Sequence, residues 1–278
     1  MKFWRTPLGV QRHYINGRYG QIHYRIAAPA HPSAVPLLCF HLSPNSGRVY
    51  AQFIAQIGHD RIAIAPDTPG FGLSDAPTTA PEISDYAACM GEFADAHGFT
   101  TFDVMGYHTG SKIALALAQQ RPAQLRRLVL VSAPIYSEAE LVQQYKSMGT
   151  SEVEKLSEDG SHLLRLWQDH WRWKDSAAPA SFIQREVAEG LVAGEQAWWG
   201  HQAAFKVQHA LELPKVEQPI LLLCPKDDLW EATQRARPFL RNGKFVELPN
   251  YAHGFLDVHT TEVVDIVRHF LDASEQTF

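Results

Sequence analysis

The sequence predicts an α/β protein with a mostly parallel, twisted sheet flanked by helices. Short apolar runs alternate with helix-prone segments along most of the chain. Strands that alternate with helices are joined by right-handed crossovers, which make the strands parallel and place helices on the sheet faces. A turn bounded by glycines at residues 106–110, between an expected strand and an expected helix, supports the same fold class.

The individual elements follow in order. Asn16-Gly17 lies between β-prone, alternating residues from 14 to 26 and predicts a β-hairpin. Further strands are expected at residues 35–40, 61–65, 101–105, 128–132, 220–224 and 244–248. Helices are expected at residues 49–57, 84–97, 111–120, 231–241 and 260–273.

The middle of the chain has a different pattern. Residues 135–215 contain no strand-like run and are polar, helix-prone and rich in tryptophan. We therefore expect a core of residues 1–134 and 216–278, with a helical cap of residues 135–215 inserted over the sheet. Trp167 and Trp171 lie four residues apart and would share one helix face. Packing between insertion and core is the plainer explanation for them, and ligand contact is the alternative.

Length and composition exclude several classes of protein. The chain has 278 residues and a net charge of −5, and no basic block supports nucleic-acid binding. The apolar runs, such as residues 219–224, are too short to span a bilayer, and the first residues lack the apolar run of a signal peptide. Cys39, Cys89 and Cys224 are an odd number without a CxxC pair, which favours buried free thiols and a cytoplasmic location.

The turn at residues 106–110 carries the clearest chemical signal. It reads Gly-Tyr-His-Thr-Gly and has the pattern of a nucleophile elbow, in which a sharp turn exposes the central side chain above the sheet. Glycines two residues to either side let the neighbouring backbones approach closely. The central residue is His108, a residue type that tolerates positive φ better than most.

Several motifs around this turn resemble the α/β-hydrolase fold family, in particular the capped haloalkane dehalogenases, epoxide hydrolases and C–C bond hydrolases. Residues 67–75 match the family loop D-x-P-G-F-G-x-S-D, and residues 41–44 match H-G-x-P with Leu42 in place of glycine. Residues 219–228 and 250–255 resemble the acid loop and the catalytic histidine loop. The resemblance covers nearly the whole chain and implies the α/β-hydrolase fold with a helical cap.

The resemblance also implies roles for the matching residues. His253 matches the general base and Asp228 the acid that orients it, with the adjacent Asp227 less favoured by its distance from the strand. The backbone N–H groups of Ser43 and Thr109 match the oxyanion hole.

Other side chains near these motifs are weaker candidates. Tyr107, Trp167 and Trp171 are candidate substrate contacts. The Ser43 hydroxyl could act as a displaced nucleophile, although a loop serine is usually a turn residue.

A metal site is an alternative interpretation of the histidines and the aspartate. His41, His108, His253 and Asp228 have suitable ligand types for zinc. Each position is better explained by the motifs of the fold, with His41 hydrogen-bonded in its loop. We therefore expect no metal and no cofactor.

A histidine at the elbow allows three kinds of chemistry. Neutral imidazole has a nucleophilic lone pair near neutral pH, so His108 could attack an acyl carbon without prior deprotonation. It could instead activate a water held between itself and His253. It could also abstract a proton from carbon, as a lyase or isomerase does.

The sequence therefore predicts a cofactor-independent hydrolase that acts on a small, largely apolar ester, lactone or C–C substrate. Alternatives are a lyase or isomerase with His108 as general base, and a ligand-binding pseudo-hydrolase. Dehalogenase and epoxide hydrolase activities are disfavoured, because both need a carboxylate at the elbow. The expected partner is a small molecule, and the sequence leaves the substrate and the oligomeric state open.

Overall fold

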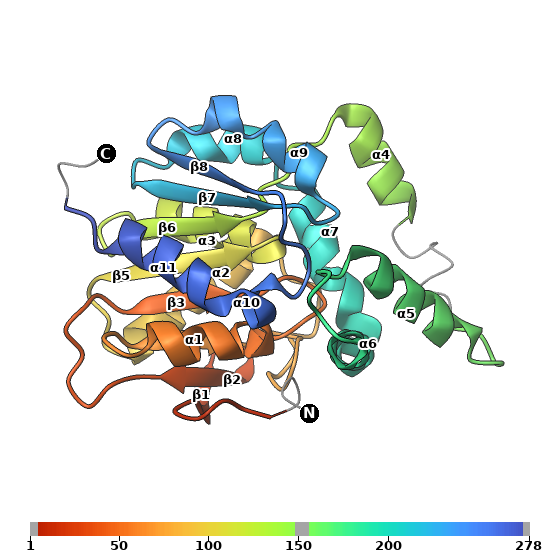
Figure 1. Ribbon diagram of the computed structural model, residues 1–278, viewed down its shortest axis with the longest axis horizontal. Coiled ribbons are helices and arrows are strands. Elements are labelled where there is room, and N and C mark those ends of the chain that lie inside the picture. The colour runs from red at the N-terminus through yellow and green to blue at the C-terminus, as the bar shows by residue number, and fades with distance from the viewer. Residues whose placement is uncertain (1–4, 148–155, 275–278) are drawn as a thin grey trace.

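The protein forms an eight-stranded sheet flanked by helices (Figure 1). Its structure, a computed structural model, describes residues 5–147 and 156–274, so residues 1–4, 148–155 and 275–278 of the expected domains lie outside the described part. The strands are β1 (Gln11–Gly17), β2 (Gly20–Ala27), β3 (Leu37–Phe40), β4 (Ala63–Pro66), β5 (Phe102–Tyr107), β6 (Leu125–Val131), β7 (Ile220–Pro225) and β8 (Gly243–Leu248).

The strand order is β1-β2-β4-β3-β5-β6-β7-β8. The hairpin β1–β2 is antiparallel, β2 also pairs antiparallel with β4, and all the other pairs are parallel. The predicted fold class, a mostly parallel sheet flanked by helices, is therefore confirmed. Parallel strands place their carboxyl ends at one edge of the sheet, and ligand sites of open α/β folds form outside that edge.

The helices of the sheet region are α1 (Ala51–Ile57), α2 (Ile83–Ala96), α3 (Thr109–Gln120), α9 (Trp230–Gln234), α10 (Phe255–Val258) and α11 (Thr260–Leu271). Short 3₁₀ turns, η2 (Gly47–Tyr50) and η5 (Arg237–Phe239), precede α1 and follow α9. Within the described residues, no helix is both long enough and apolar enough to cross a membrane. Cys39, Cys89 and Cys224 are buried and free, as the sequence predicts.

Two expected elements differ in detail from the structure. The hairpin forms, but the ladder continues through the Gly17–Gly20 pair, so the turn consists of residues 18 and 19 and Asn16-Gly17 belongs to β1. The helix expected over residues 231–241 ends at Gln234, and a 3₁₀ turn with Pro238 follows. Proline has no N–H and disfavours the helical conformation of the residue before it, which accounts for the early end.

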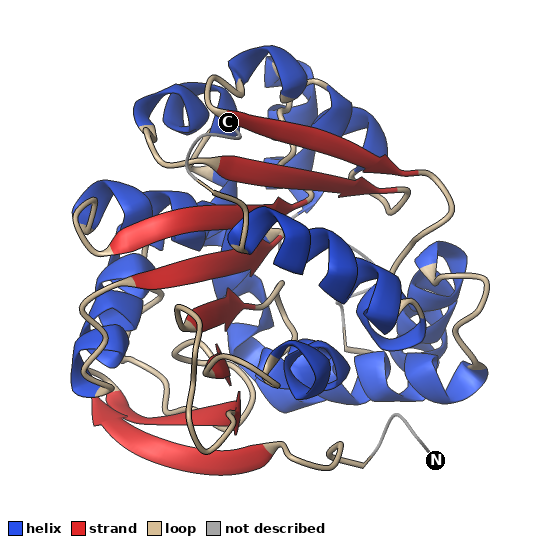
Figure 2. Ribbon diagram, turned by 60° about the vertical axis from the view of Figure 1, so that its left-hand side comes forward, coloured by secondary structure: helices blue, strands red, loops and turns tan. Residues whose placement is uncertain are grey.

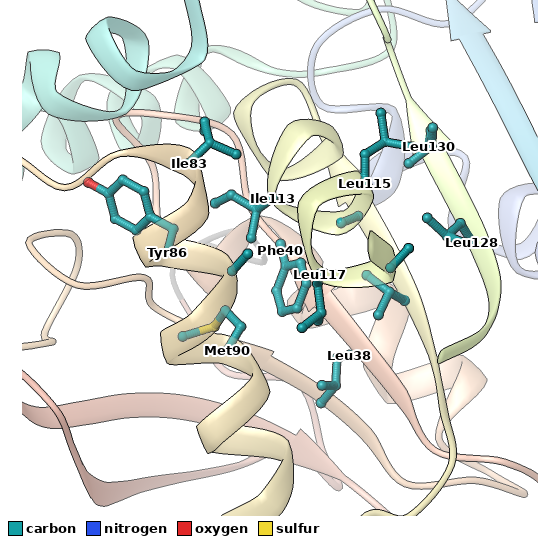
Figure 3. Close-up of a cluster of buried hydrophobic side chains, with 14 of the residues drawn as sticks. Leu38, Phe40, Ile83, Tyr86, Met90, Ile113, Leu115, Leu117, Leu128 and Leu130 are labelled. Atoms are coloured by element: carbon teal, nitrogen blue, oxygen red, sulfur yellow. The ribbon is translucent and has the colours of Figure 1, made fainter. Parts of the chain in front are cut away.

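The core has two layers because the central strands are covered on both faces. Alternate side chains point to opposite faces of a strand. Leu38 and Phe40 of β3 therefore pack with α2 and α3, whereas Leu37 and Cys39 pack with α1 and α11. Figure 3 shows the first layer, where side chains of β3 and β6 meet those of α2 and α3. This burial explains why the central strands are continuous apolar runs in the sequence.

The region between β6 and β7 is helical in its described part. It contains α4 (Glu138–Ser147), α5 (Ser161–Trp173), α6 (Ala180–Ala193), η3 (Gly194–Trp198), α7 (Trp199–Phe205), α8 (His209–Glu212) and η4 (Leu213–Lys215). Helices α5 and α6 lie beyond the end of the sheet, beside the loops that follow the parallel strands (Figures 1 and 2). We refer to residues 135–215 as the helical segment.

Buried polar contacts attach α6 to the sheet region. Arg185 donates two hydrogen bonds to Asp257, at 3.0 and 2.6 Å. Asn45 donates to Glu186 at 2.7 Å. Buried charges are stable only when they are paired in this way, so these contacts fix where α6 sits.

The turn between β5 and α3 has no spare volume. A Cβ atom at Gly106 would lie within 3.0 Å of the Gly110 carbonyl, and one at Gly110 would lie within 3.0 Å of the Phe40 carbonyl. These contacts are with backbone atoms, which cannot rotate away. Both glycines are therefore required for β5, α3 and the end of β3 to meet.

We expect Gly110→Ala to lower the free energy of unfolding by about 3 kcal/mol or more, because the new methyl group would overpack against backbone. Urea unfolding followed by circular dichroism measures the change. Gly190→Ala is the matched control, because a Cβ there would have its nearest neighbours at 3.9 Å and alanine favours a helix. Equal stability of the two variants would contradict the prediction.

Candidate active site

His108 stands at the elbow between β5 and α3, as the sequence predicts. Its backbone has φ 49° and ψ −110°, a strained conformation for a residue with a side chain. The His108 N–H donates to the Val131 carbonyl at 3.0 Å, and the Ser111 hydroxyl donates to the His108 carbonyl at 2.6 Å. These bonds on both sides hold the imidazole above the carboxyl end of the sheet.

The His108 side chain is paired with Asp227. The sequence suggests this aspartate only as the less favoured partner of His253. His108 Nε2 lies 2.9 Å from Asp227 Oδ2. The same carboxylate, which is buried, accepts hydrogen bonds from the Ser132 hydroxyl at 2.7 Å and from the Leu229 N–H at 2.9 Å. Asp227 is thus fixed in position and fixes His108 in turn. The sequence feature that could have indicated this role is the pair of consecutive aspartates, Asp227 and Asp228, after the buried strand β7.

His253 is paired with Asp228, as the sequence predicts. His253 Nε2 lies 2.7 Å from Asp228 Oδ1. Burial alone would lower the pKa of His253, but the hydrogen bond to Asp228 and the negative charges of Asp228, Asp227 and Glu186 raise it to about 9. Burial alone would raise the pKa of Asp228, and the hydrogen bond and positive charge of His253 bring it well below its usual value. At neutral pH this pair is therefore an imidazolium and a carboxylate.

Tyr107 and the two histidines form one aromatic group. The rings of His108 and His253 are 5.3 Å apart and meet edge to face. The buried Tyr107 stacks beside His253, and its hydroxyl lies 3.3 Å from His253 Nδ1. Tyr107 therefore contacts the candidate base directly.

The helical segment holds the backbone of the histidine loop. The His253 N–H donates to the Trp173 carbonyl at 3.2 Å, and the His253 carbonyl accepts from the Asp175 N–H at 2.8 Å. The buried Asp175 carboxylate accepts from the Ala252 N–H at 3.0 Å and lies 3.2 Å from the His259 ring. The sequence alone does not reveal this role of Asp175, because no local pattern indicates that it contacts Ala252, 77 residues further along the chain.

The two expected oxyanion donors lie on adjoining loops. Gly110 packs against the backbone of Phe40 and His41, which brings the start of α3 beside the loop containing Ser43. Within the described chain, the N–H groups of Ser43 and Thr109 donate to no protein acceptor. Unpaired N–H groups at a helix start are suited to stabilise negative charge.

His41 takes no part in the two histidine–aspartate pairs, and the two tryptophans stack on each other within α5. His41 is buried and bonded within its own loops, through Nδ1 to the Leu42 carbonyl and through Nε2 to Thr68. Trp167 stacks on Trp171 and packs beside Phe182. Trp171 is 48% exposed. Their contact with substrate stays a prediction.

Two further histidines of the helical segment are electrostatically linked to the site. Burial lowers the pKa of His201 to about 4, and the charges of His108 and Asp228 also affect it. Burial likewise lowers the pKa of His170, which senses Glu186, His253 and Asp228. Within the described residues, His201 Nδ1 and His170 Nε2 are buried without a hydrogen-bond partner. Burial therefore disfavours the charged form of both rings.

Four of these side chains could together hold a metal ion. His108, Asp227, Asp228 and His253 each offer one ligand atom, and these atoms lie within 4.8 Å of one another. The set differs from the one considered from the sequence, because Asp227 takes the place of His41. Histidine nitrogens and carboxylate oxygens suit zinc. In the structure the same atoms are paired with each other directly.

Comparison with known proteins identifies the family. The sequence profile of the alpha/beta hydrolase fold family matches residues 35–229, well over half of the chain. The chain therefore belongs to this family.

Individual known proteins are similar to this chain over different shares of its length. A haloalkane dehalogenase 2 of Mycobacterium bovis is 32% identical over 112 residues, which are 40% of this chain and 38% of that protein. The chain thus aligns with about four-tenths of the length of that relative. A hydrolase structure from Pseudomonas aeruginosa superposes with a TM-score of 0.77 at 16% identity, covering 95% and 99% of the two chains. An enol-lactonase structure from Burkholderia xenovorans superposes with a TM-score of 0.72 at 18% identity, covering 94% of this chain and 100% of that chain.

We expect Asp228→Asn to lower the pKa of His253 from about 9 toward or below 6.5, because the neutral amide removes the charge that stabilises the imidazolium while burial still disfavours it. An NMR titration of the His253 ring protons measures the shift. Asp95→Asn, at an exposed ion pair with Arg121, is the control. An unchanged His253 pKa would contradict the assigned pairing.

Proposed function

We propose that this protein hydrolyses a small, largely apolar ester, lactone or C–C substrate, with His108 in place of the usual nucleophile. The observation that carries the proposal is the pairing of each facing histidine with its own aspartate, His108 with Asp227 and His253 with Asp228. A ligand-binding protein without catalysis has no need for two such pairs.

The hydrogen bond to Asp227 determines which atom of His108 reacts. The carboxylate accepts, so Nε2 carries the proton of the neutral ring. The lone pair is then on Nδ1, which is the nucleophilic or basic atom. His108 either attacks the acyl carbon through Nδ1, giving an acyl-imidazole that water clears, or takes a proton from the attacking water. Asp227 stabilises the positive charge that develops on the ring in both routes.

His253 and the loop N–H groups complete the proposed mechanism. As an imidazolium, His253 places positive charge beside His108 and can donate a proton to the leaving group. The N–H groups of Ser43 and Thr109 would stabilise the oxyanion of the tetrahedral intermediate. This arrangement requires no cofactor.

The size of the site supports a small substrate. A hollow beside His253 and Tyr107 has a volume of about 10 Å³, and its lining combines apolar residues such as Leu42, Val49 and Phe182 with the charged Arg185, Glu186 and Asp257. That is room for a single water molecule. We therefore propose that residues 135–215 act as a cap over a core of residues 1–134 and 216–278. Substrate would enter when α6, which supplies Phe182, moves aside.

Two features of the comparisons bear on the substrate. The fold that this protein shares with the enol-lactonase is compatible with a lactone. Dehalogenation is not part of the proposal, because an alkyl-enzyme ester needs a carboxylate nucleophile and the elbow carries an imidazole.

We expect wild-type protein to hydrolyse at least one member of a panel of p-nitrophenyl esters and aryl lactones. His108→Ser should lower kcat by about 10²-fold or more, since a serine would lack a base in hydrogen-bond contact. Asp227→Asn should lower kcat by about 10²–10⁴-fold, because the amide can hold the wrong tautomer of His108. Spectrophotometric initial rates measure both effects.

The control for this experiment is His97→Gln, a histidine of the α2 C-terminus bonded to the Phe93 carbonyl. It should retain wild-type turnover. An inert wild type with a His108→Ser variant that gains esterase activity would contradict the proposal. A lyase, an isomerase or a ligand-binding protein would then be the candidate.

We also expect that removal of divalent cations leaves turnover unchanged, because the imidazoles act directly. Dialysis against EDTA, followed by metal analysis and an ester assay, tests this. Loss of activity that Zn²⁺ restores would instead assign a metal-assisted reaction to His108, Asp227, Asp228 and His253.

A further inference from the structure

A second cavity lies between the N-terminal hairpin, η2 and helix α6. Its volume is about 210 Å³. Five arginines are among its lining residues, which we call the arginine pocket: Arg5, Arg12, Arg25, Arg48 and Arg185. Three acids, Asp67, Glu189 and Asp257, also line it, so the lining has an excess of two positive charges.

Two of the arginines are direct neighbours across the hairpin. Arg12 of β1 is paired in register with Arg25 of β2. Like charges directly opposite one another destabilise an antiparallel pair. Arg25 is also buried, which makes the repulsion less screened by water. Burial, together with the charges of Arg48 and Arg12, lowers the pKa of Arg25 despite the opposing effect of Asp67 and Glu189.

The three acids are already engaged by other groups. The Asp67 carboxylate accepts from the His23 ring at 2.8 Å, from the Gly47 N–H at 2.9 Å and from the Leu73 N–H at 3.0 Å, besides Arg25 at 3.1 Å. This carboxylate therefore has little capacity left for a second arginine.

The other two acids form hydrogen bonds and ion pairs that connect α6 to neighbouring elements. Glu189 accepts from the Ser46 hydroxyl at 2.5 Å and pairs with Arg48 at 3.3 Å. Asp257 holds Arg185 through two hydrogen bonds.

Several guanidinium N–H groups that line the pocket therefore have no acceptor within the described residues. Within the described chain, the guanidinium of Arg12 makes no hydrogen bond or ion pair, and neither does that of Arg5. The guanidinium of Arg25, with five N–H donors, makes one hydrogen bond, to Asp67. All three line the same cavity.

We propose that the arginine pocket binds a small oxyanion with two negative charges, such as phosphate or a dicarboxylate, between Arg12, Arg25 and Arg5. Guanidinium groups match the oxygens of phosphate and carboxylate in pairs. A dianion offsets the excess charge and separates the facing arginines. The volume of about 210 Å³ is roughly twenty times that of the hollow beside His253, which gives room for such an ion with some of its water.

The position of the pocket gives the bound ion a structural consequence. Arg48 and Ser46 connect η2 to α6 through Glu189, and Arg185 connects α6 to α10 through Asp257. An anion on Arg12 and Arg25 adds the N-terminal hairpin to this set of contacts. The ion therefore ties the hairpin to the wall that α6 forms.

Isothermal titration calorimetry with inorganic phosphate, at constant ionic strength set with NaCl, tests the proposal. Wild type should bind about one phosphate per chain, and Arg12→Gln should weaken binding about tenfold or more, as expected for the loss of a charge-assisted hydrogen bond. Arg12 is exposed, so this variant should fold. Arg18→Gln, in the same hairpin but paired with Glu92, is the control and should bind like wild type. Succinate is titrated in parallel as the dicarboxylate probe.

Absence of binding for both probes would overturn the proposal, and so would equal weakening by Arg12→Gln and Arg18→Gln. The source of the anion follows from a second measurement, which rests on the proposed hydrolase activity. Phosphate that raises KM without changing kcat assigns the pocket to an anionic part of the substrate. If phosphate binds without affecting KM, the pocket instead holds an anion that is separate from the substrate. Because calorimetry needs no turnover, failure of the proposed hydrolase activity does not affect the binding result.

Discussion

The close contact of backbones at the start of α3 is the constraint on which the site depends. Neither Gly106 nor Gly110 has room for a Cβ atom, and the atoms in the way are main-chain carbonyls. This contact forces His108 into positive φ and joins the elbow to the end of β3. The imidazole and the free N–H groups of Ser43 and Thr109 are consequently presented at one edge of the sheet. Everything proposed for the chemistry uses that arrangement.

Two consecutive aspartates serve two different histidines. Asp227 is buried and holds His108, while Asp228 is more exposed and holds His253. Neighbouring side chains in a non-helical loop can point in different directions, which lets one short loop supply both carboxylates. A family triad with serine needs only one such acid. In the proposed mechanism, the second acid fixes the tautomer of the histidine at the elbow, and thereby the ring nitrogen that reacts.

The helical segment takes part in the site as well as covering it. Backbone bonds from Trp173 and Asp175 hold both sides of His253, so this segment is mechanically connected to His253. The same region contributes His170 and His201, each with one buried ring nitrogen. In the proposed mechanism substrate enters when this segment moves, which would couple substrate entry to the geometry of His253.

The sequence alone determined the fold class and the elbow with His108, because these depend on local patterns: apolar runs, glycine spacing and a turn between a strand and a helix. Asp228 and His253 were located through the resemblance of their loops to those of the α/β-hydrolase family. The sequence could not place the turn of the first hairpin, which the pairing of Gly17 with Gly20 decides. It also could not find the role of Asp227, the contact of Asp175 with the histidine loop, or the facing Arg12 and Arg25. Those depend on which distant segments meet, and side-chain direction and strand register are settled only when the whole sheet and its helices pack together.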